Sequence, residues 1–380
     1  MGSSEPSPYV RDLQPNITAL DGIRGLALIQ VLLAHTHYIL SSDPFAVNVT
    51  RWTFVNRIFE PGYLGLDIFF TLSGFLITSL LLRDLALWRG GVESGSSILR
   101  RFYARRALRL LPALYVMLAA SWIWVLVTDD VSHEAHWGST FSAVLYIANW
   151  AIVWGSPATN PDLGHLWSLA VEEQFYIVWP ILLLLLVRLC KSHAIKIVLI
   201  AAIALLVLWH RTNIYGDGVD WLATYIRTDT RVDSMLIGAL FAIVYRHFRI
   251  DHKLMSIAAW ICLAGIMFYK FGPPPADRFT IGFTRTSVFA GFCLLAAASG
   301  SWSMNKVLSW RPFAALGRYS YGLYLYHHVV FLGVGRHMPQ YSQSIRLMVA
   351  YGLSALFTFL SWRYVEARCL KLKSRFETRH

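Results

Sequence analysis

Eleven apolar segments follow one another along this chain of 380 residues, and they constrain its fold more than any other feature. An α-helix needs about 20 predominantly apolar residues to cross a bilayer. Charged residues make up only 15% of the chain, against about 25% in soluble domains, so too few are present to coat a soluble surface. The sequence therefore predicts an all-α polytopic membrane helix bundle. The segments are 18–40, 62–83, 106–127, 139–154, 166–188, 196–210, 232–247, 254–270, 284–299, 319–336 and 345–365.

One of these segments, 139–154, is shorter than most and contains Asn149. The stretches on both sides of it, 128–138 and 155–165, contain neither Lys nor Arg and are therefore expected outside the cell. We interpret 139–154 as a re-entrant or interfacial segment. About ten transmembrane helices remain, and both termini are then predicted to be cytoplasmic.

The basic residues support this orientation. Of the 34 Lys and Arg residues, 23 fall in segments placed inside, 10 in segments placed outside, and one, Arg24, within a span. Lys and Arg concentrate in cytoplasmic loops of membrane proteins, so topology explains most of the net charge of +12. Nucleic acid is not an expected partner, whereas membrane lipid is.

The chain is predicted to form one transmembrane domain over 18–365, between a cytoplasmic N-terminal segment, 1–17, and a basic cytoplasmic tail, 366–380. None of its 4 Cys residues has a CxxC partner, so we expect no metal and no disulfide framework. The sequence does not indicate an oligomeric state.

Three ionisable residues lie in the first span, namely Asp21, Arg24 and His35. Such residues are costly inside a membrane and are candidates for function. Arg24 and His35 are 11 residues apart, which places them within about 20° on one helix face and about 16 Å apart along the axis. We expect Arg24 near the cytoplasmic end and His35 near the outer end.

The second span contains Asp67 in its outer part and Ser73 near mid-membrane. Asp67 either takes part in chemistry or pairs with an Arg. Before the third span, Arg105, Arg106 and Arg109 lie one helical turn apart or less. They either anchor the helix or form an anion site, which would suit the phosphates of a nucleotide-bearing cofactor.

The segment 165–180 carries the adjacent carboxylates Glu172 and Glu173. Adjacent residues cannot share one helix face, so at most one of the two points toward His35. Trp167 lies nearby in the sequence. We expect this carboxylate to orient His35 or to hold a substrate hydroxyl.

Arg231 and Asp233 stand at the same outer level as His35, where an ordinary ion pair at a helix start is the alternative to a functional role. Tyr324 lies three residues before His327 on one helix face near mid-membrane, and both are candidates for packing or for function.

Six blocks, in order over about residues 18–365, resemble the acyltransferase 3 family of membrane O-acyltransferases, in its stand-alone form. They are LDGIRGLALIQVLLAH, GLDIFFTLSGFLIT, FYARRALRLLPALY, HLWSLAVEEQFYIVWP, RVDSMLIG and GRYSYGLYLYH. The family's Arg-x10-His motif falls on Arg24 and His35, and its Arg-x-x-Arg motif on Arg106 and Arg109. Its WSL-x-x-E block begins at Trp167 and ends at Glu172.

This resemblance implies transfer of an acyl group, usually acetyl from cytoplasmic acetyl-CoA, to a hydroxyl of an extracytoplasmic glycan or lipid-linked sugar at the bacterial inner membrane. Direct transfer and an acyl-histidine intermediate both stay open, and a glycan or lipid flippase is the alternative function. The expected site comprises His35, Glu172, Asp67 and Arg24 as catalytic residues; Arg105, Arg106, Arg109, Arg24, Ser73 and His327 at the donor; and Asp21, Trp167, Arg231, Asp233 and Tyr324 at the acceptor.

Overall fold

The computed structural model describes residues 10–13, 17–40, 62–156, 159–271 and 277–372, and throughout these ranges the regular structure is helical. Parts of the predicted terminal segments, 1–9, 14–16 and 373–380, lie outside the described residues. The first elements are α1 (Thr18–His35), α2 (His37–Leu40), α4 (Gly62–Arg89), α5 (Gly95–Thr128), α6 (His133–Val144), α7 (Ala148–Val153), η1 (Pro161–Leu163), α8 (Leu166–Leu189), α9 (His193–Gly216) and α10 (Trp221–Ile226). They are followed by η2 (Thr228–Thr230), α11 (Val232–His247), α12 (His252–Phe271), α13 (Ile281–Ser299), α14 (Asn305–Leu308), α15 (Arg311–Arg318), α16 (Ser320–His337), α17 (Gln343–Ser361), η3 (Trp362–Glu366) and α18 (Ala367–Lys371).

Among the described residues, six helices are long and apolar enough to cross a membrane: α4, α5, α8, α9, α13 and the continuous run from α17 through η3 to α18. The apolar part of α12 is shorter. The other predicted spans correspond to α1, α11 and α16, which have 16 to 18 residues and carry the ionisable side chains discussed below. The chain is therefore an all-α integral membrane bundle, as the sequence predicts.

The predicted segment 139–154 is divided between two short helices. α6 has 12 residues and α7 has 6, and Tyr146 between them adopts a left-handed backbone conformation with φ of 56°. At 1.5 Å per residue, neither helix is long enough to cross a bilayer. This break is consistent with a re-entrant or interfacial segment.

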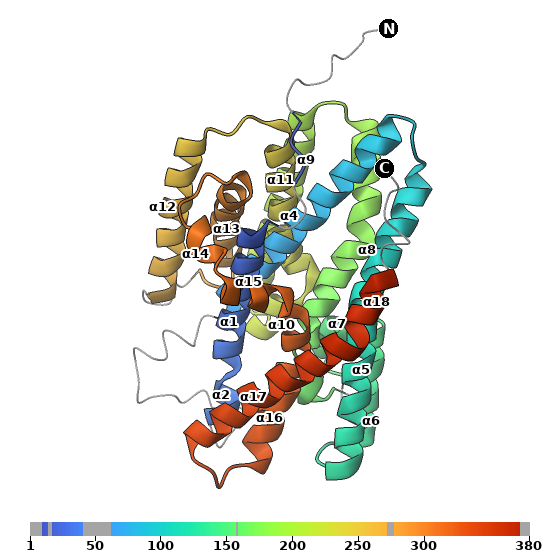
Figure 1. Cartoon of the computed structure of the whole chain (residues 1–380), viewed down its shortest axis with the longest axis vertical. Coiled ribbons are helices and arrows are strands. Elements are labelled where there is room, and N and C mark those ends of the chain that lie inside the picture. Colours follow the sequence, from blue (N-terminus) through green and yellow to red (C-terminus); the bar gives the residue numbers. More distant parts are fainter. Residues whose placement is uncertain (1–9, 14–16, 41–61, 157–158, 272–276, 373–380) are drawn as a thin grey trace.

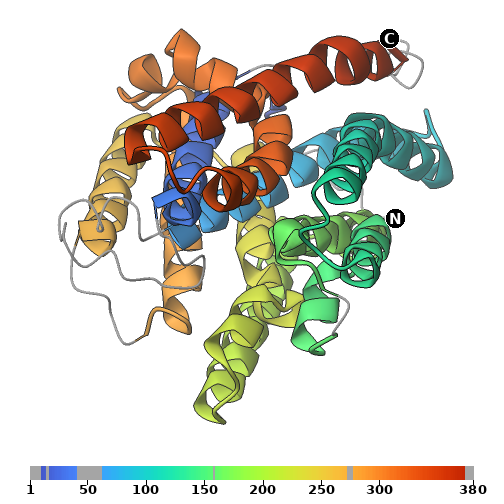
Figure 2. The same cartoon turned by 90° about the horizontal axis from the view of Figure 1, so that it is seen from below.

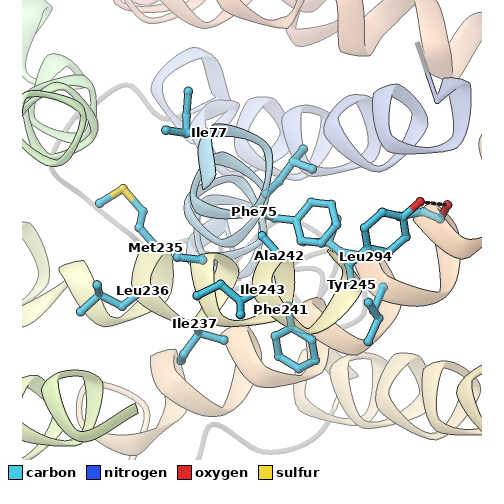
Figure 3. Close-up of a cluster of buried hydrophobic side chains, with 14 of the residues drawn as sticks. Phe75, Ile77, Met235, Leu236, Ile237, Phe241, Ala242, Ile243, Tyr245 and Leu294 are labelled. Atoms are coloured by element: carbon cyan, nitrogen blue, oxygen red, sulfur yellow. Dashed lines mark hydrogen bonds between the residues drawn. The ribbon is translucent and has the colours of Figure 1, made fainter. Parts of the chain in front are cut away.

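The helices α4 and α11 cross in close contact. A Cβ on Gly74 would collide with the carbonyl of Met235, and a Cβ on Gly238 would collide with the carbonyl of Thr71. Glycine at these positions lets the two backbones approach closely, as at many membrane helix interfaces. Figure 3 shows the buried core beside this crossing, in which Phe75 of α4 packs among side chains of α11.

The first helix runs through the middle of the molecule, where it packs against α4 and α15 and contacts α16 (Figure 1). α9 and α17 lie at different margins of the bundle (Figure 2). A helix in the middle can present polar side chains to several neighbours, and α1 carries Arg24 and His35 into the interior. The predicted end of the transmembrane domain at 365 falls inside a continuous helix, because η3 joins α17 to α18 without a break.

Candidate active site

His35 is the last residue of α1, and one hydrogen bond joins it to α16. Its Nδ1 lies 2.8 Å from Nε2 of His327. His327 Nδ1 in turn lies 2.7 Å from the carbonyl oxygen of Tyr324 and 3.0 Å from that of Leu323. Carbonyl oxygens only accept hydrogen bonds, so His327 Nδ1 carries a proton and, in the neutral ring, Nε2 accepts. His35 therefore donates from Nδ1, and its lone pair is on Nε2.

The second nitrogen of the His35 ring is open. Nε2 makes no hydrogen bond with any residue that the structure describes, and it is not among the fully enclosed polar atoms. A neutral imidazole with a free Nε2 lone pair can take a proton from a hydroxyl group within reach. The geometry therefore suits His35 to act as a general base.

His165 and His328, which were not predicted as site residues from the sequence, form a cluster with His35 and His327. The His328 ring meets His35 edge-on with centroids 5.2 Å apart, and His165 stacks on His328 at 4.6 Å. His328 Nδ1 donates to the carbonyl of Asp162 at 3.0 Å, and His165 Nε2 donates to that of Leu325 at 3.1 Å. Within the described ranges, no three His, Cys, Asp or Glu side chains are placed to hold a metal ion.

Glu172 faces α4 rather than His35. Both Ser73 and Tyr176 donate hydrogen bonds to Glu172 Oε1, the latter at 3.2 Å. In the part of the chain that the structure describes, no hydrogen bond joins His35 to Glu172 or to Asp67. The expectation that one of these carboxylates orients His35 is therefore corrected, since His327 holds that place.

Arg106 lies beside Tyr176 and the second glutamate of this segment, Glu173. The Arg106 guanidinium packs over the Tyr176 ring, 3.6 Å from its centroid, and its Nη2 lies 3.5 Å from Glu173 Oε1. Glu173, for which no role was predicted from the sequence, is buried and faces Arg106. Arg106 is thereby held by an aromatic face and a carboxylate.

Arg24 and Arg109 lie within electrostatic range of Arg106. Arg24 Nη1 lies 3.5 Å from Asp21 Oδ1, which is a loose ion pair. Arg109 is exposed and forms no hydrogen bond or ion pair with the described residues. Three guanidinium groups from α1 and α5 thus converge, and Arg109 among them forms no ion pair with a described carboxylate.

Arg105, which was grouped with these arginines in the sequence, has a different environment. Its Nη2 lies 2.9 Å from Asp84 Oδ2, so it forms an ion pair between α5 and α4. Asp84 is buried. The structure therefore brings Arg106 and Arg109 together with Arg24 but engages Arg105 elsewhere.

The carboxylates expected around His35 form ion pairs with other partners. Arg231 pairs with Asp67 and packs 3.8 Å from the Phe283 ring. Asp233 pairs with Arg211 through both of its oxygens, at 3.0 and 3.1 Å. An ion pair between Arg231 and Asp233 was the sequence-based alternative, and it does not form because each residue pairs across to another helix.

Trp167 lies on α8 and Tyr324 on α16, and of these two described residues only Tyr324 forms a ring contact or hydrogen bond with the histidine cluster. Trp167 packs against Tyr225 with centroids 4.9 Å apart. The Tyr324 hydroxyl donates to the carbonyl of His165 at 2.7 Å, and its ring lies 5.5 Å from that of His327. Tyr324 therefore ties the start of α8 to the helix that holds His327.

The arrangement thus combines a group of arginines near the start of α1 with a histidine at the end of α1 whose Nε2 has no described hydrogen-bond partner. A family model described as an acyltransferase domain matches residues 17–363. The chain belongs to this acyltransferase family.

Curated relatives carry related names. A Bacillus subtilis protein whose provisional name is peptidoglycan O-acetyltransferase is 32% identical over 83% of this chain and 48% of its own length. The peptidoglycan O-acetyltransferase OatA of Listeria monocytogenes is 28% identical over 94% of this chain and 56% of its own length. A Staphylococcus aureus protein, provisionally named an O-acetyltransferase, is 27% identical over 92% and 56%. The chain thus spans about half the length of these relatives, and no solved structure matches it significantly.

Proposed function

We propose that this acyltransferase domain transfers an acetyl group from acetyl-CoA to a hydroxyl of a cell-wall glycan. The observation that carries this proposal is the state of His35, whose Nδ1 is committed to His327 while Nε2 is open. Arg24, 11 residues earlier on the same helix, lies about 16 Å from it along the axis, within the arginine group. One helix therefore links an anion-binding end to a proton-accepting end.

The residues at the inner end suit a phosphate-bearing donor. Arg109 is exposed and forms no ion pair with a described carboxylate, and stacking on Tyr176 holds Arg106 in place. Planar guanidinium groups bind phosphate oxygens through paired N–H donors. We assign the phosphates of acetyl-CoA to Arg106 and Arg109, with Arg24 beside them.

At the outer end, His35 Nε2 takes the proton of the acceptor hydroxyl as its oxygen attacks the thioester carbon. The new C–O bond forms, the C–S bond breaks, and the CoA thiolate leaves. The proton on Nε2 then passes to the sulfur, which restores the neutral ring. The hydrogen bond from Nδ1 to His327 stabilises the imidazolium that exists between these two transfers.

The acceptor follows from the relatives, two of which are named for peptidoglycan. We therefore propose a hydroxyl of a peptidoglycan sugar as the acceptor for this chain. The sequence-based orientation, with the basic end of the bundle in the cytoplasm, places the donor inside the cell and the acceptor outside.

Binding of acetyl-CoA to the purified chain, measured by calorimetry, tests the donor assignment. Replacing both Arg106 and Arg109 by Gln removes two charge-assisted contacts and should weaken binding about tenfold or more. Arg100→Gln, at an exposed position on the same helix, removes one charge outside the site and should leave affinity unchanged. An unaltered affinity in the double variant would refute the arginine site. Absence of any acetyl-CoA binding would instead favour a flippase, which has no use for this donor.

A further inference from the structure

A second group of basic side chains gathers where α4, α8 and α11 end and α9 begins. The basic cluster consists of Arg89, His193, Lys196 and His247, which lie within electrostatic range of one another. The rings of His193 and His247 stack with centroids 3.6 Å apart. Figure 1 shows the end of α8 and the start of α9 at the same end of the bundle. None of these residues belongs to the proposed active site.

Lys196 is the least expected member, because it is only 1% exposed. Its Nζ has one hydrogen bond, to the carbonyl of Lys191 at a long 3.4 Å. Arg89 donates to the carbonyl of Val187 at 2.6 Å, and no described carboxylate forms an ion pair with either cation. Burying an ammonium beside another cation costs free energy unless an anion compensates it.

The two histidines add further unused polar atoms. Nδ1 of His193 and Nδ1 of His247 are both enclosed, and neither has a hydrogen-bond partner within the described residues. Buried polar groups in folded proteins nearly always have a partner, and an imidazole nitrogen can donate a hydrogen bond when it is protonated. The basic cluster therefore combines two cations that form no ion pair with a described carboxylate and two imidazole nitrogens without a described partner, and a phosphate can accept hydrogen bonds from both kinds of group.

Apolar side chains are exposed on α8 and α9, near the helix ends that carry part of the basic cluster. Leu185 and Leu189 on α8 and Ile195 and Leu199 on α9 are exposed. Side chains of this kind on transmembrane helices face lipid acyl chains. A free phosphate ion would make no use of these neighbours, whereas a phospholipid carries both a phosphate and hydrocarbon chains.

We propose that the basic cluster binds the phosphate headgroup of an anionic phospholipid, with its acyl chains along the exposed side chains at the end of α8 and the start of α9. Basic pockets between transmembrane helices bind such headgroups. General anchoring by loop lysines does not explain Lys196, because an anchoring lysine extends its ammonium into water. The site is separate from the proposed acyltransferase chemistry and stands without it.

The test measures binding of phosphatidylglycerol to the purified full chain in detergent by native mass spectrometry and by the shift in unfolding temperature. The wild-type chain should retain bound phosphatidylglycerol and gain stability from it, but not from phosphatidylcholine. Lys196→Met replaces the side chain by an unbranched, uncharged one that is one atom shorter, and it should weaken binding at least about fivefold, since one basic residue contributes roughly that factor. Lys196→Arg preserves the charge and should retain binding.

Lys253→Met is the matched control, because it removes one charge at an exposed position at the start of α12. It should bind phosphatidylglycerol as the wild type does. Equal binding by Lys196→Met and wild type would overturn the site. An equal stabilisation of the wild type by inorganic phosphate alone would overturn the assignment to a lipid. If Lys196→Met fails to fold, absence of bound phosphatidylglycerol from both the wild type and Lys196→Arg would overturn it as well.

Discussion

At the scale of single residues, the ability of His35 to act as a base depends on which of its ring nitrogens carries the proton. Two backbone carbonyls hold the proton of His327 on Nδ1, and this leaves Nε2 to accept from His35. The tautomer of His35 is therefore set by the backbone of α16, through His327. For the proposed acetyl transfer, His327 would be a positioning residue and His35 the catalytic one.

Replacing His327 tests this relation. His327→Leu removes the acceptor for His35 Nδ1 and should lower kcat about tenfold to a hundredfold, within the roughly 10²–10⁴ that a general base contributes. KM for acetyl-CoA should stay unchanged. His327→Gln retains an acceptor oxygen and should recover part of the rate. Nitrogen-15 spectra of the His35 ring should show the proton on Nδ1 in wild type and a mixture of tautomers in His327→Leu.

His328→Gln serves as the control for this experiment. His328 lies next to His327 and also touches the His35 ring, but it donates its hydrogen bond to Asp162. The substitution should leave the His35 tautomer unchanged. If His327→Leu also keeps the wild-type tautomer and rate, the positioning role is wrong.

The sequence identified both His35 and His327 but not the bond between them. The two residues are separated by 292 positions, and helical spacing does not say which helices become neighbours. The sequence pattern placed Arg106 beside Arg109 because a single helix carries both residues. Contacts within one helix could be predicted, whereas those between helices, including Glu172 with Ser73, needed the structure.

At the scale of elements, apolar length predicted where the helices lie, although six of the described helices, rather than about ten, are long and apolar enough to cross a membrane. Apolar length did not predict how α6 is held against the bundle. His136 of α6 is buried, its Nε2 lies 3.2 Å from Ser121 Oγ, and its Nδ1 lies 2.8 Å from Asn160 Nδ2. Because Ser121 donates its own proton to the carbonyl of Leu118, His136 must donate from Nε2 and accept on Nδ1.

This geometry makes the docking of α6 sensitive to acid. Burial lowers the pKa of His136, and the effect is only partly offset by Asp162. The unfolded chain therefore binds a proton more readily, so stability is full above about pH 6.5 and falls as the pH drops below it. Between pH 7.5 and 5.5 the free energy of unfolding should fall by about 1 kcal/mol from this group.

Thermal unfolding of wild type and His136→Gln at these two pH values measures the effect. The glutamine variant has no titrating ring, so its unfolding temperature should change less between pH 7.5 and 5.5. An equal change in both proteins would show that another group causes the acid sensitivity.

At the scale of the whole molecule, much of the charge buried inside the bundle is structural. Arg211 reaches from α9 to Asp233 on α11 and to Thr284 on α13, and it donates to the carbonyls of Thr230 and Thr280 as well. The sequence could not distinguish such a link from a substrate site, because both place an ionisable residue within a span. The structure distinguishes the two cases, because an ionisable residue that pairs with an opposite charge on another helix is a structural link.

Breaking this link should destabilise the whole bundle. Arg211→Met leaves the Asp233 carboxylate buried without its cation, which costs about 3–5 kcal/mol. Replacing Asp233 by Leu in the same chain removes the unpaired charge and should restore part of the stability. Unfolding temperatures of the single and double variants give the comparison. Equal loss in both would show that the ion pair is not the cause.

The central claim is that His35 acts as the general base when an acetyl group passes from acetyl-CoA to a glycan hydroxyl. The most direct measurement uses the full chain in proteoliposomes with carbon-13-labelled acetyl-CoA and a soluble peptidoglycan fragment, followed by mass spectrometry of the fragment. We expect a labelled acetyl ester with wild type and none with His35→Asn, although that variant still binds acetyl-CoA. Equal labelling by His35→Asn, or no ester from a wild-type chain that binds acetyl-CoA, would contradict the account.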